Sequence, residues 1–113
     1  MQMPVGFNMD YDRDALVAGI EQASLNIARI QSVLNVQTQA LQGHQQTLVL
    51  LLRTGGQDKR CAQLRAAIEE ANEAVKSFYA AIRVESQKQV QFQQYVEYID
   101  WMATHGDVHV RPN

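Results

Sequence analysis

Acidic residues are the first candidates for chemistry in this sequence. Glu69, Glu70 and Glu73 lie within little more than one helical turn, and carboxylates on helices can hold metal ions inside a helical bundle. Such metal sites also use Glu-x-x-His pairs and carboxylates on a facing helix. The sequence has no Glu-x-x-His pair, and no acid lies between Arg29 and Arg53. We therefore interpret the three glutamates as solvated side chains and predict no metal site.

Histidine and cysteine give no stronger indication of catalysis. His105 and His109 lie on either side of Gly106, so they are not a dependable pair of helical ligands. Cys61 is the single cysteine, which rules out an internal disulfide, and the sequence has no glycine-rich phosphate loop or nucleophile elbow. We predict a protein that is not an enzyme and has no catalytic residues, cofactor or small-molecule substrate.

The elements that carry these residues are predicted to be two long helices. Apolar residues recur at alternating steps of three and four, the heptad pattern of coiled coils. In the first helix, over 11–53, the heptad positions are Leu16, Ile20, Ala23, Ile27, Ile30, Leu34, Gln37, Leu41, His44, Leu48 and Leu51. In the second, over 59–104, they are Cys61, Leu64, Ile68, Ala71, Val75, Phe78, Ile82, Glu85, Gln89, Phe92, Val96, Ile99 and Ala103. The pattern predicts an all-α fold, an antiparallel two-helix coiled-coil hairpin over 11–104.

Residues 54–58, Thr-Gly-Gly-Gln-Asp, predict the turn of this hairpin. Gly55 suits the left-handed position that ends a helix, and Asp58 suits the N-cap of the next one. If the turn is centred on Gly56, each heptad position of the first helix faces a heptad position of the second, and the two residue numbers total 112. Because the turn and the two heptads are independent signals, their agreement supports the hairpin.

Short arms are predicted at both ends of the chain. Residues 1–10 lack a helical period and predict an N-terminal extended arm, and residues 105–113 predict a C-terminal extended arm. Both arms leave from the same end of an antiparallel hairpin. Aromatic residues also collect at that end, namely Phe7, Tyr11, Phe92, Tyr95, Tyr98 and Trp101. They predict a small aromatic core, with a partner-binding patch as the alternative.

The positions beside the heptad seam of the first helix carry no charge. One flank consists of Val17, Ser24, Gln31, Thr38, Gln45 and Leu52, and the other of Gly19, Asn26, Val33, Ala40 and Thr47. Charged pairs normally occupy these positions in a two-stranded coil. Their absence predicts that the hairpin completes a four-helix or larger bundle by oligomerisation. The alternative is a solvated face in which glutamine serves as a good helix former.

The residues expected to bind partners lie on these flanks, at the turn and at the open end. The run Leu48–Leu52 is apolar around the whole helix, which favours either a packed tip or a docking point. The predicted partner-binding residues are Val33, Ala40, Thr47, Leu50, Leu52, Ala67, Ala74, Ala81, Tyr95, Tyr98 and Trp101. Their expected partners are further copies of the chain, as a homo-oligomer, and other protein subunits.

Charge and hydropathy narrow the function further. The net charge of −2 and the absence of a basic run argue against nucleic acid as a partner. The segment between Arg29 and Arg53 has six glutamines and is too polar to span a membrane. The first residues lack the features of a signal peptide, which predicts synthesis in the cytoplasm and leaves open incorporation into a virion or export by a signal-independent system.

A hairpin of this length resembles the small secreted WXG-type helical proteins. The resemblance covers the architecture alone, because the turn has no Trp, and Tyr95 and Tyr98 are followed four residues later by Ile99 and Met102 instead of an acid. The sequence predicts a non-enzymatic structural or assembly subunit of a multi-chain complex, for example a phage particle or a secretion apparatus. The alternative is a small soluble helical chaperone or adaptor that holds a client helix.

Overall fold

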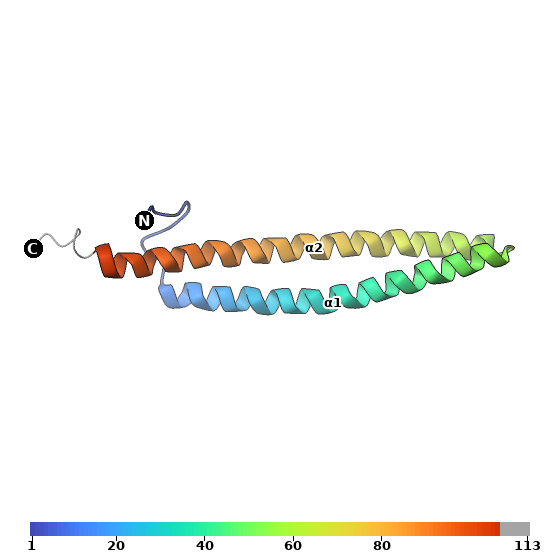
Figure 1. Ribbon diagram of the computed structural model, residues 1–113, viewed down its shortest axis with the longest axis horizontal. Coiled ribbons are helices and arrows are strands. Elements are labelled where there is room, and N and C mark those ends of the chain that lie inside the picture. Colours follow the sequence, from blue (N-terminus) through green and yellow to red (C-terminus); the bar gives the residue numbers. More distant parts are fainter. Residues whose placement is uncertain (107–113) are drawn as a thin grey trace, which may run out of the picture. The chain divides into compact units, whose positions relative to one another are not determined.

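Two long helices dominate the computed structural model, which describes residues 1–106 (Figure 1). Helix α1 covers Arg13–Thr54, helix α2 covers Asp58–Trp101, and a short π-helix, η1, covers Met102–Gly106. The two long helices pack against each other, and the described residues form no strand. The prediction of an all-α helical hairpin is confirmed. Most of the predicted C-terminal arm lies outside the described residues, and its first two residues belong to η1.

Helix α1 begins at Arg13, two residues later than predicted, because Asp12 caps it. The carbonyl oxygen of Asp12 accepts a hydrogen bond from Leu16 N at 3.0 Å. Its side-chain oxygen Oδ1 accepts a second one from Asp14 N at 3.2 Å. An aspartate in this position accepts a hydrogen bond from a free backbone amide of the first helical turn. Its negative charge also interacts favourably with the positive end of the helix dipole.

The turn between the helices depends on two glycines with positive φ. Gly55 and Gly56 have φ angles of 74° and 72°, in the left-handed region that costs other residues energy. Gly55 N donates to Leu51 O at 3.0 Å and so closes the last turn of α1, as expected for a glycine that ends a helix. Gln57 O accepts from Cys61 N, so the capping position is Gln57, and Asp58 is the first helical residue instead of the predicted N-cap.

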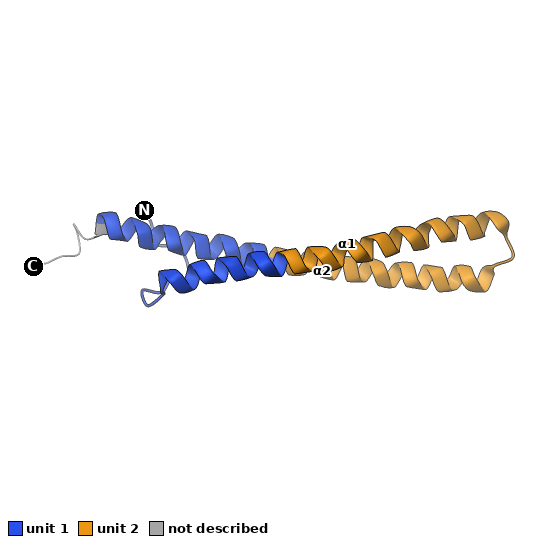
Figure 2. Ribbon diagram, turned by 90° about the horizontal axis from the view of Figure 1, so that it is seen from below, with its two compact units in different colours: residues 1–27, 84–113 blue, residues 28–83 orange. Residues whose placement is uncertain are grey.

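The chain divides into two compact units (Figure 2). Residues 1–27 and 84–113 form the first, which we call the open-end unit because it contains both termini. Residues 28–83 form the second, which we call the tip unit because it contains the turn. Each unit pairs one stretch of α1 with one stretch of α2, and each is described separately below.

The core of the open-end unit forms where three buried residues meet. Leu16, Tyr95 and Val96 form a buried cluster, and several half-buried apolar residues pack against it: Phe7, Val17, Ile20, Phe92 and Ile99. Gly19 allows the Phe92 ring to approach α1 closely. A Cβ atom on Gly19 would lie 2.6 Å from Phe92 Cε2, closer than real Cβ contacts allow.

The core of the tip unit is thinner. Three of its residues, Leu34, Cys61 and Ala71, are buried, and all three occupy predicted heptad positions. The larger apolar side chains of the same seam remain half-exposed: Ile30, Leu41, Leu48, Leu51, Leu64, Ile68, Val75, Phe78 and Ile82. The heptad therefore places the right residues between the helices, but one seam does not remove them from solvent.

The N-terminal segment, Met1–Asp12, differs from the extended arm predicted for residues 1–10. It contains two turns, closed by hydrogen bonds from Phe7 N to Pro4 O at 3.2 Å and from Tyr11 N to Asn8 O at 3.0 Å. Gly6 has a φ of 81° between them. The segment turns back because Phe7 then packs against the aromatic side chains of α2, which removes apolar surface from water. In an extended segment Phe7 would remain in solvent.

The contact between Gly19 and Phe92 predicts opposite results for two glycine substitutions in α1. In the monomeric chain, Gly43→Ala should raise the free energy of unfolding by about 1 kcal/mol, the difference in helix propensity, because no atom of the chain lies within 4 Å of its Cβ position. Gly19→Ala should lose that gain or destabilise the protein, because the Phe92 ring has to move. Thermal unfolding followed by circular dichroism at low micromolar concentration measures both. Equal stabilisation by the two substitutions would contradict the packing described here.

An ion pair between Arg13 and Asp100 joins the two helices and predicts a dependence on pH. Arg13 Nε and Nη2 donate to the two Asp100 oxygens at 2.8 and 3.2 Å. The hydrogen bond from Arg13 holds the pKa of the Asp100 carboxyl below its usual value. Because this pKa is lower in the folded chain, the pair stabilises the fold above the ordinary carboxyl pKa of about 4, and the stabilisation disappears as the pH falls through the folded value.

Asp100→Asn should therefore lower the melting temperature near neutral pH, and this effect should shrink as the pH falls through the lowered pKa of Asp100, because the carboxyl is then protonated in both states. Asp10→Asn, outside the ion pair, is the control. A destabilisation by Asp100→Asn that stays constant across this pH range would show that the ion pair is not its cause.

Candidate protein-interaction surface

The tip unit presents a small-residue groove on one side of its seam. The α1 side carries Val33, Val36, Ala40, Gly43, Thr47 and Leu50, again at alternating steps of three and four, and the α2 side carries Ala67, Ala74 and Ala81. We call these nine residues the groove face. A depression of about 280 Å³ lies between the two rows, lined by Gln37, Ala40, His44, Ala67, Glu70, Ala71 and Ala74. The structure thus brings together three of the predicted partner-binding residues, Ala40, Ala67 and Ala74.

The groove face exposes large apolar side chains at its two ends. Val36 and Leu50 are 63% and 61% exposed, and Val33 is also exposed. The centre of the α1 row, by contrast, consists of Ala40 and Gly43. Large exposed apolar residues at regular helical spacing, beside a row of alanines, form a surface that another helix can approach closely.

Charge is nearly absent from this side of the tip unit. The α1 row has none, and Glu70 is the charged residue that lines the depression. Charged side chains on such a face would favour contact with water over burial against another surface. The face is therefore best complemented by an uncharged, largely apolar surface.

The opposite flank of the tip unit has a different character. Its α1 positions include Gln31, Thr38 and Gln45, and Thr38 Oγ1 donates to Leu34 O at 2.8 Å. Leu52, one of the predicted partner-binding residues, lies on this flank and not on the groove face. It is exposed together with Val49, so the end of α1 beside the turn is apolar on more than one side.

The aromatic residues of the open-end unit form the predicted cluster. The Phe7 ring contacts the rings of Tyr11, Tyr95 and Tyr98 in edge-to-face geometry at centroid distances of 5.7, 5.7 and 5.0 Å. Edge-to-face pairs are a favourable arrangement for aromatic rings. Tyr98 in turn stacks on Trp101 at 6.0 Å. The prediction of an aromatic core at this end is confirmed.

The three predicted partner-binding residues of this cluster differ in their access to solvent. Tyr95 is 2% exposed, and its hydroxyl donates to Val5 O at 3.0 Å, so it binds the N-terminal segment of its own chain. Tyr98 and Trp101 are half-buried. Trp101 also stacks on His105 at 5.3 Å, which extends the row of rings into η1.

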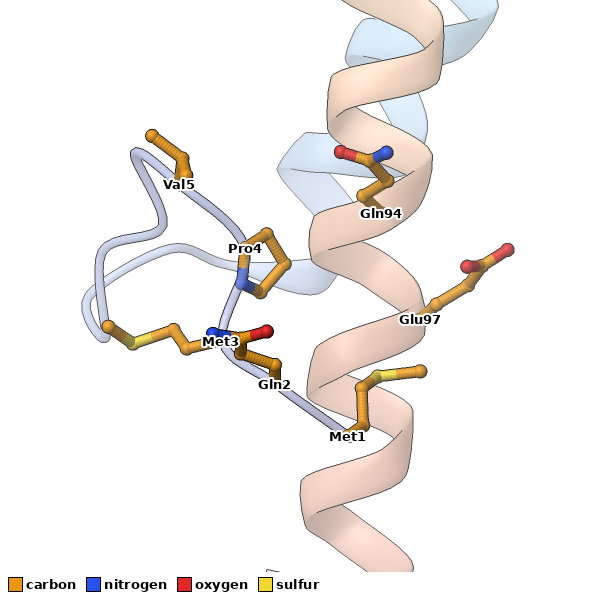
Figure 3. A pocket seen from close by; sticks show the side chains of 7 residues that line it. All are labelled: Met1, Gln2, Met3, Pro4, Val5, Gln94 and Glu97. Carbon is orange, nitrogen blue, oxygen red and sulfur yellow. The ribbon is translucent and has the colours of Figure 1, made fainter.

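A second depression, which sequence reasoning missed, lies between the N-terminal segment and α2 (Figure 3). Its volume is about 410 Å³, and it is lined by Met1, Gln2, Met3, Pro4, Val5, Gln94 and Glu97. In Figure 3 the segment runs alongside α2, and Val5 points away from the helix. Met1, Met3 and Val5 are largely exposed. Their apolar character was visible in the sequence, but their position on α2 depends on the turn at Gly6.

The polar seam residues Glu85 and Gln89 have unequal environments. Gln89 Nε2 donates to Ile20 O at 3.2 Å and also bonds to Ser24 Oγ. Glu85 Oε2, by contrast, is buried without a hydrogen-bond partner, and Lys88 Nζ lies 3.6 Å from it. The Gln89 amide thus has hydrogen-bond partners on α1, whereas Glu85 Oε2 has the Lys88 ammonium nearby but no hydrogen bond.

Within residues 1–106 the structure shows neither a candidate metal site nor a candidate membrane-spanning helix. These residues contain no group of three or more His, Cys, Asp or Glu placed to hold a metal ion. Among the same residues, no helix has the length and apolar character required to cross a membrane. The groove face and the N-terminal depression are therefore the candidate surfaces for contact with another protein.

The buried Glu85 oxygen accepts no hydrogen bond from the described residues and has only the ammonium of exposed Lys88, on its own helix, in ion-pair range. We therefore predict that an apolar substitution at this position stabilises the fold. Glu85→Leu removes a buried acceptor and continues the apolar seam, so the free energy of unfolding should rise by about 1 kcal/mol or more. Glu73→Leu, at an exposed position, is the control and should change stability little. Chemical denaturation of the three proteins measures the difference. A clear loss of stability in Glu85→Leu would show that the carboxylate makes a favourable interaction within the fold.

Comparisons of this chain with models of protein families, with curated proteins and with solved structures found no match in any of the three. The function proposed for it therefore depends on the geometry described above.

Proposed function

We propose that the chain is a non-enzymatic structural or assembly subunit that acts by packing its helices against other protein subunits, including further copies of itself. The observation that carries this proposal is the groove face of the tip unit. It combines exposed apolar residues, closely spaced alanines and an uncharged α1 row above a thin seam. A phage particle and a secretion apparatus are examples of assemblies that use such subunits.

The thin seam of the tip unit supports association for an energetic reason. Ordering a residue costs about 1–2 kcal/mol of backbone conformational entropy, which apolar burial must offset. Half-buried Ile68 and Phe78 gain a fraction of what full burial would give. Packing a further helix layer over the groove would cover more of the seam, as in a four-helix bundle.

The open-end unit supports contacts with other subunits through its N-terminal segment. The segment exposes Met1, Met3 and Met9, of which Met1 and Met3 line the depression beside α2. Methionine side chains are flexible and polarisable, and such residues adapt to differently shaped partners. In the assembly that we propose, the groove face holds the subunits together and the N-terminal segment reaches a neighbour.

The second candidate function is a small helical chaperone or adaptor that holds a client helix. The depression beside Ala40 and Ala74 favours it, because a groove between two helices accepts an amphipathic helix. A chaperone of this kind would be recovered from cells with one stoichiometric small partner and would not associate with itself. A structural subunit would instead form a defined oligomer when purified alone.

The mass of the purified protein in solution tests the proposal, and two alanine substitutions identify the surfaces involved. Size-exclusion chromatography with light scattering should give an oligomer for the unsubstituted chain. Ala71 is 8% exposed in the seam, so Ala71→Glu should abolish helicity, as judged by circular dichroism. Ala74 is half-exposed in the groove, so Ala74→Glu should keep the helicity and lower the mass to that of a monomer.

Ala66→Glu, at an exposed position of α2, is the matched control and should change neither helicity nor mass. A folded monomer of the unsubstituted chain at concentrations up to tens of micromolar would overturn self-association. It would leave the adaptor function as the better explanation of the groove.

A further inference from the structure

The α1 row of the groove face has a symmetric pattern of side-chain sizes. It reads Val33, Val36, Ala40, Gly43, Thr47, Leu50, with the larger residues at its ends and the smallest in its centre. Its steps of three and four are the same when the row is read in either direction. A two-fold rotation about a point between Ala40 and Gly43 therefore places each residue of the row on another residue of the row. The spacing is the same after the rotation, and the side-chain sizes are nearly the same.

We infer that the groove face binds a second copy of this chain, with the α1 helices of the two copies antiparallel about a two-fold axis between Ala40 and Gly43. This inference rests on the self-association proposed above and names its surface and register. Two-fold interfaces use the same patch on both copies, so the patch must complement itself. In this register Val33 faces the Leu50 position of the second copy, Val36 faces Thr47, and Ala40 faces Gly43.

The small residues allow the two α1 backbones to approach at the axis. A Cβ on Gly43 would have no atom within 4 Å in its own chain, so space for a neighbour remains at this point. Glycine in a helix interior costs about 1 kcal/mol relative to alanine. A close helix crossing at Ala40 and Gly43 offsets this cost by bringing the flanking apolar residues into contact.

The second helix of each copy contributes to the same interface. Ala67 and Ala74 lie on the same side of the seam as Ala40, as their shared depression shows, and Ala81 follows Ala74 at the same seven-residue spacing. That depression of about 280 Å³ lies beside the proposed axis, where the ridge formed by the second α1 would enter it.

Charge favours a second copy over an oppositely charged partner. The chain has no Asp, Glu, Lys or Arg between Arg29 and Arg53, so two α1 rows can meet without burying a charge of their own. Glu70 of α2, which lines the depression beside them, is exposed and can keep its carboxylate in water at the edge of the interface. A strongly charged partner could form no ion pair with this part of α1. The row instead needs an uncharged helix with small residues at its centre, which α1 of another copy provides.

The area of the face is sufficient for a weak to moderate dimer. The row from Val33 to Leu50 is about 26 Å long at about 1.5 Å per residue, and a helix pair is about 20 Å wide. Each copy would therefore bury about 500 Å², or about 1,000 Å² in total. This total is close to the lower limit of about 1,000 Å² for a specific interface.

Opposite charges placed at facing positions test the inference. Val36→Glu and Thr47→Lys should each convert the dimer to a monomer while retaining helicity, because a charge would be buried without a partner. An equimolar mixture of the two variants should restore association, since Glu at position 36 of one copy then faces Lys at position 47 of the other. The double variant should also associate, because positions 36 and 47 of one chain lie about 16 Å apart along the helix and cannot pair with each other.

Gln39→Glu and Gln46→Lys, which lie on the outer side of α1, are the matched controls and should retain the mass of the unsubstituted chain. Light scattering gives the masses, and circular dichroism verifies the helicity. If Val36→Glu remains an oligomer, the chain associates through another face, and the inference fails while the proposed function stands. If the unsubstituted chain is a monomer, self-association itself fails. If both single variants are monomeric and their mixture remains so, the two-fold register is wrong.

Discussion

A single seam between two helices is the constraint on which the rest of this structure depends. In a pair of helices, each seam side chain is covered by the facing helix alone. Solvent therefore reaches most seam side chains from the flanks. Ala71 and Leu34 are buried, whereas Ile68 and Phe78 of the same seam remain half-exposed. The properties of the flanks therefore decide how stable each unit is and what it can bind.

The open-end unit and the tip unit meet this constraint in different ways. In the open-end unit the N-terminal segment supplies a third layer. Phe7 packs against the core, and the Val5 carbonyl oxygen accepts a hydrogen bond from the hydroxyl of buried Tyr95. The tip unit has no such layer within the described chain, and its groove face remains uncovered. This difference is the physical reason for placing the main interaction surface in the tip unit.

Side-chain size controls the contacts of this protein more than charge does. Gly19 allows the Phe92 ring to come closer than a Cβ atom would permit, while the Cβ position of Gly43 has no atom within 4 Å. The ion pair of Arg13 with Asp100 lies on the surface, where its contribution is small. Shape, in the form of small residues opposite large ones, thus explains the internal packing, and it is also the basis of the self-association that we propose.

The sequence by itself determined the helices, their turn and the residues of the seam, because heptad spacing and the left-handed preference of Gly55 are local signals. It also indicated the uncharged flank and the aromatic end. Only the tertiary structure decided that residues 1–12 fold back onto α2, that Tyr95 is buried, and that Ala40, Ala67 and Ala74 line one depression. These features depend on contacts between residues far apart in the chain, whose formation is governed by the fit of side chains in space, which no local pattern of the sequence specifies.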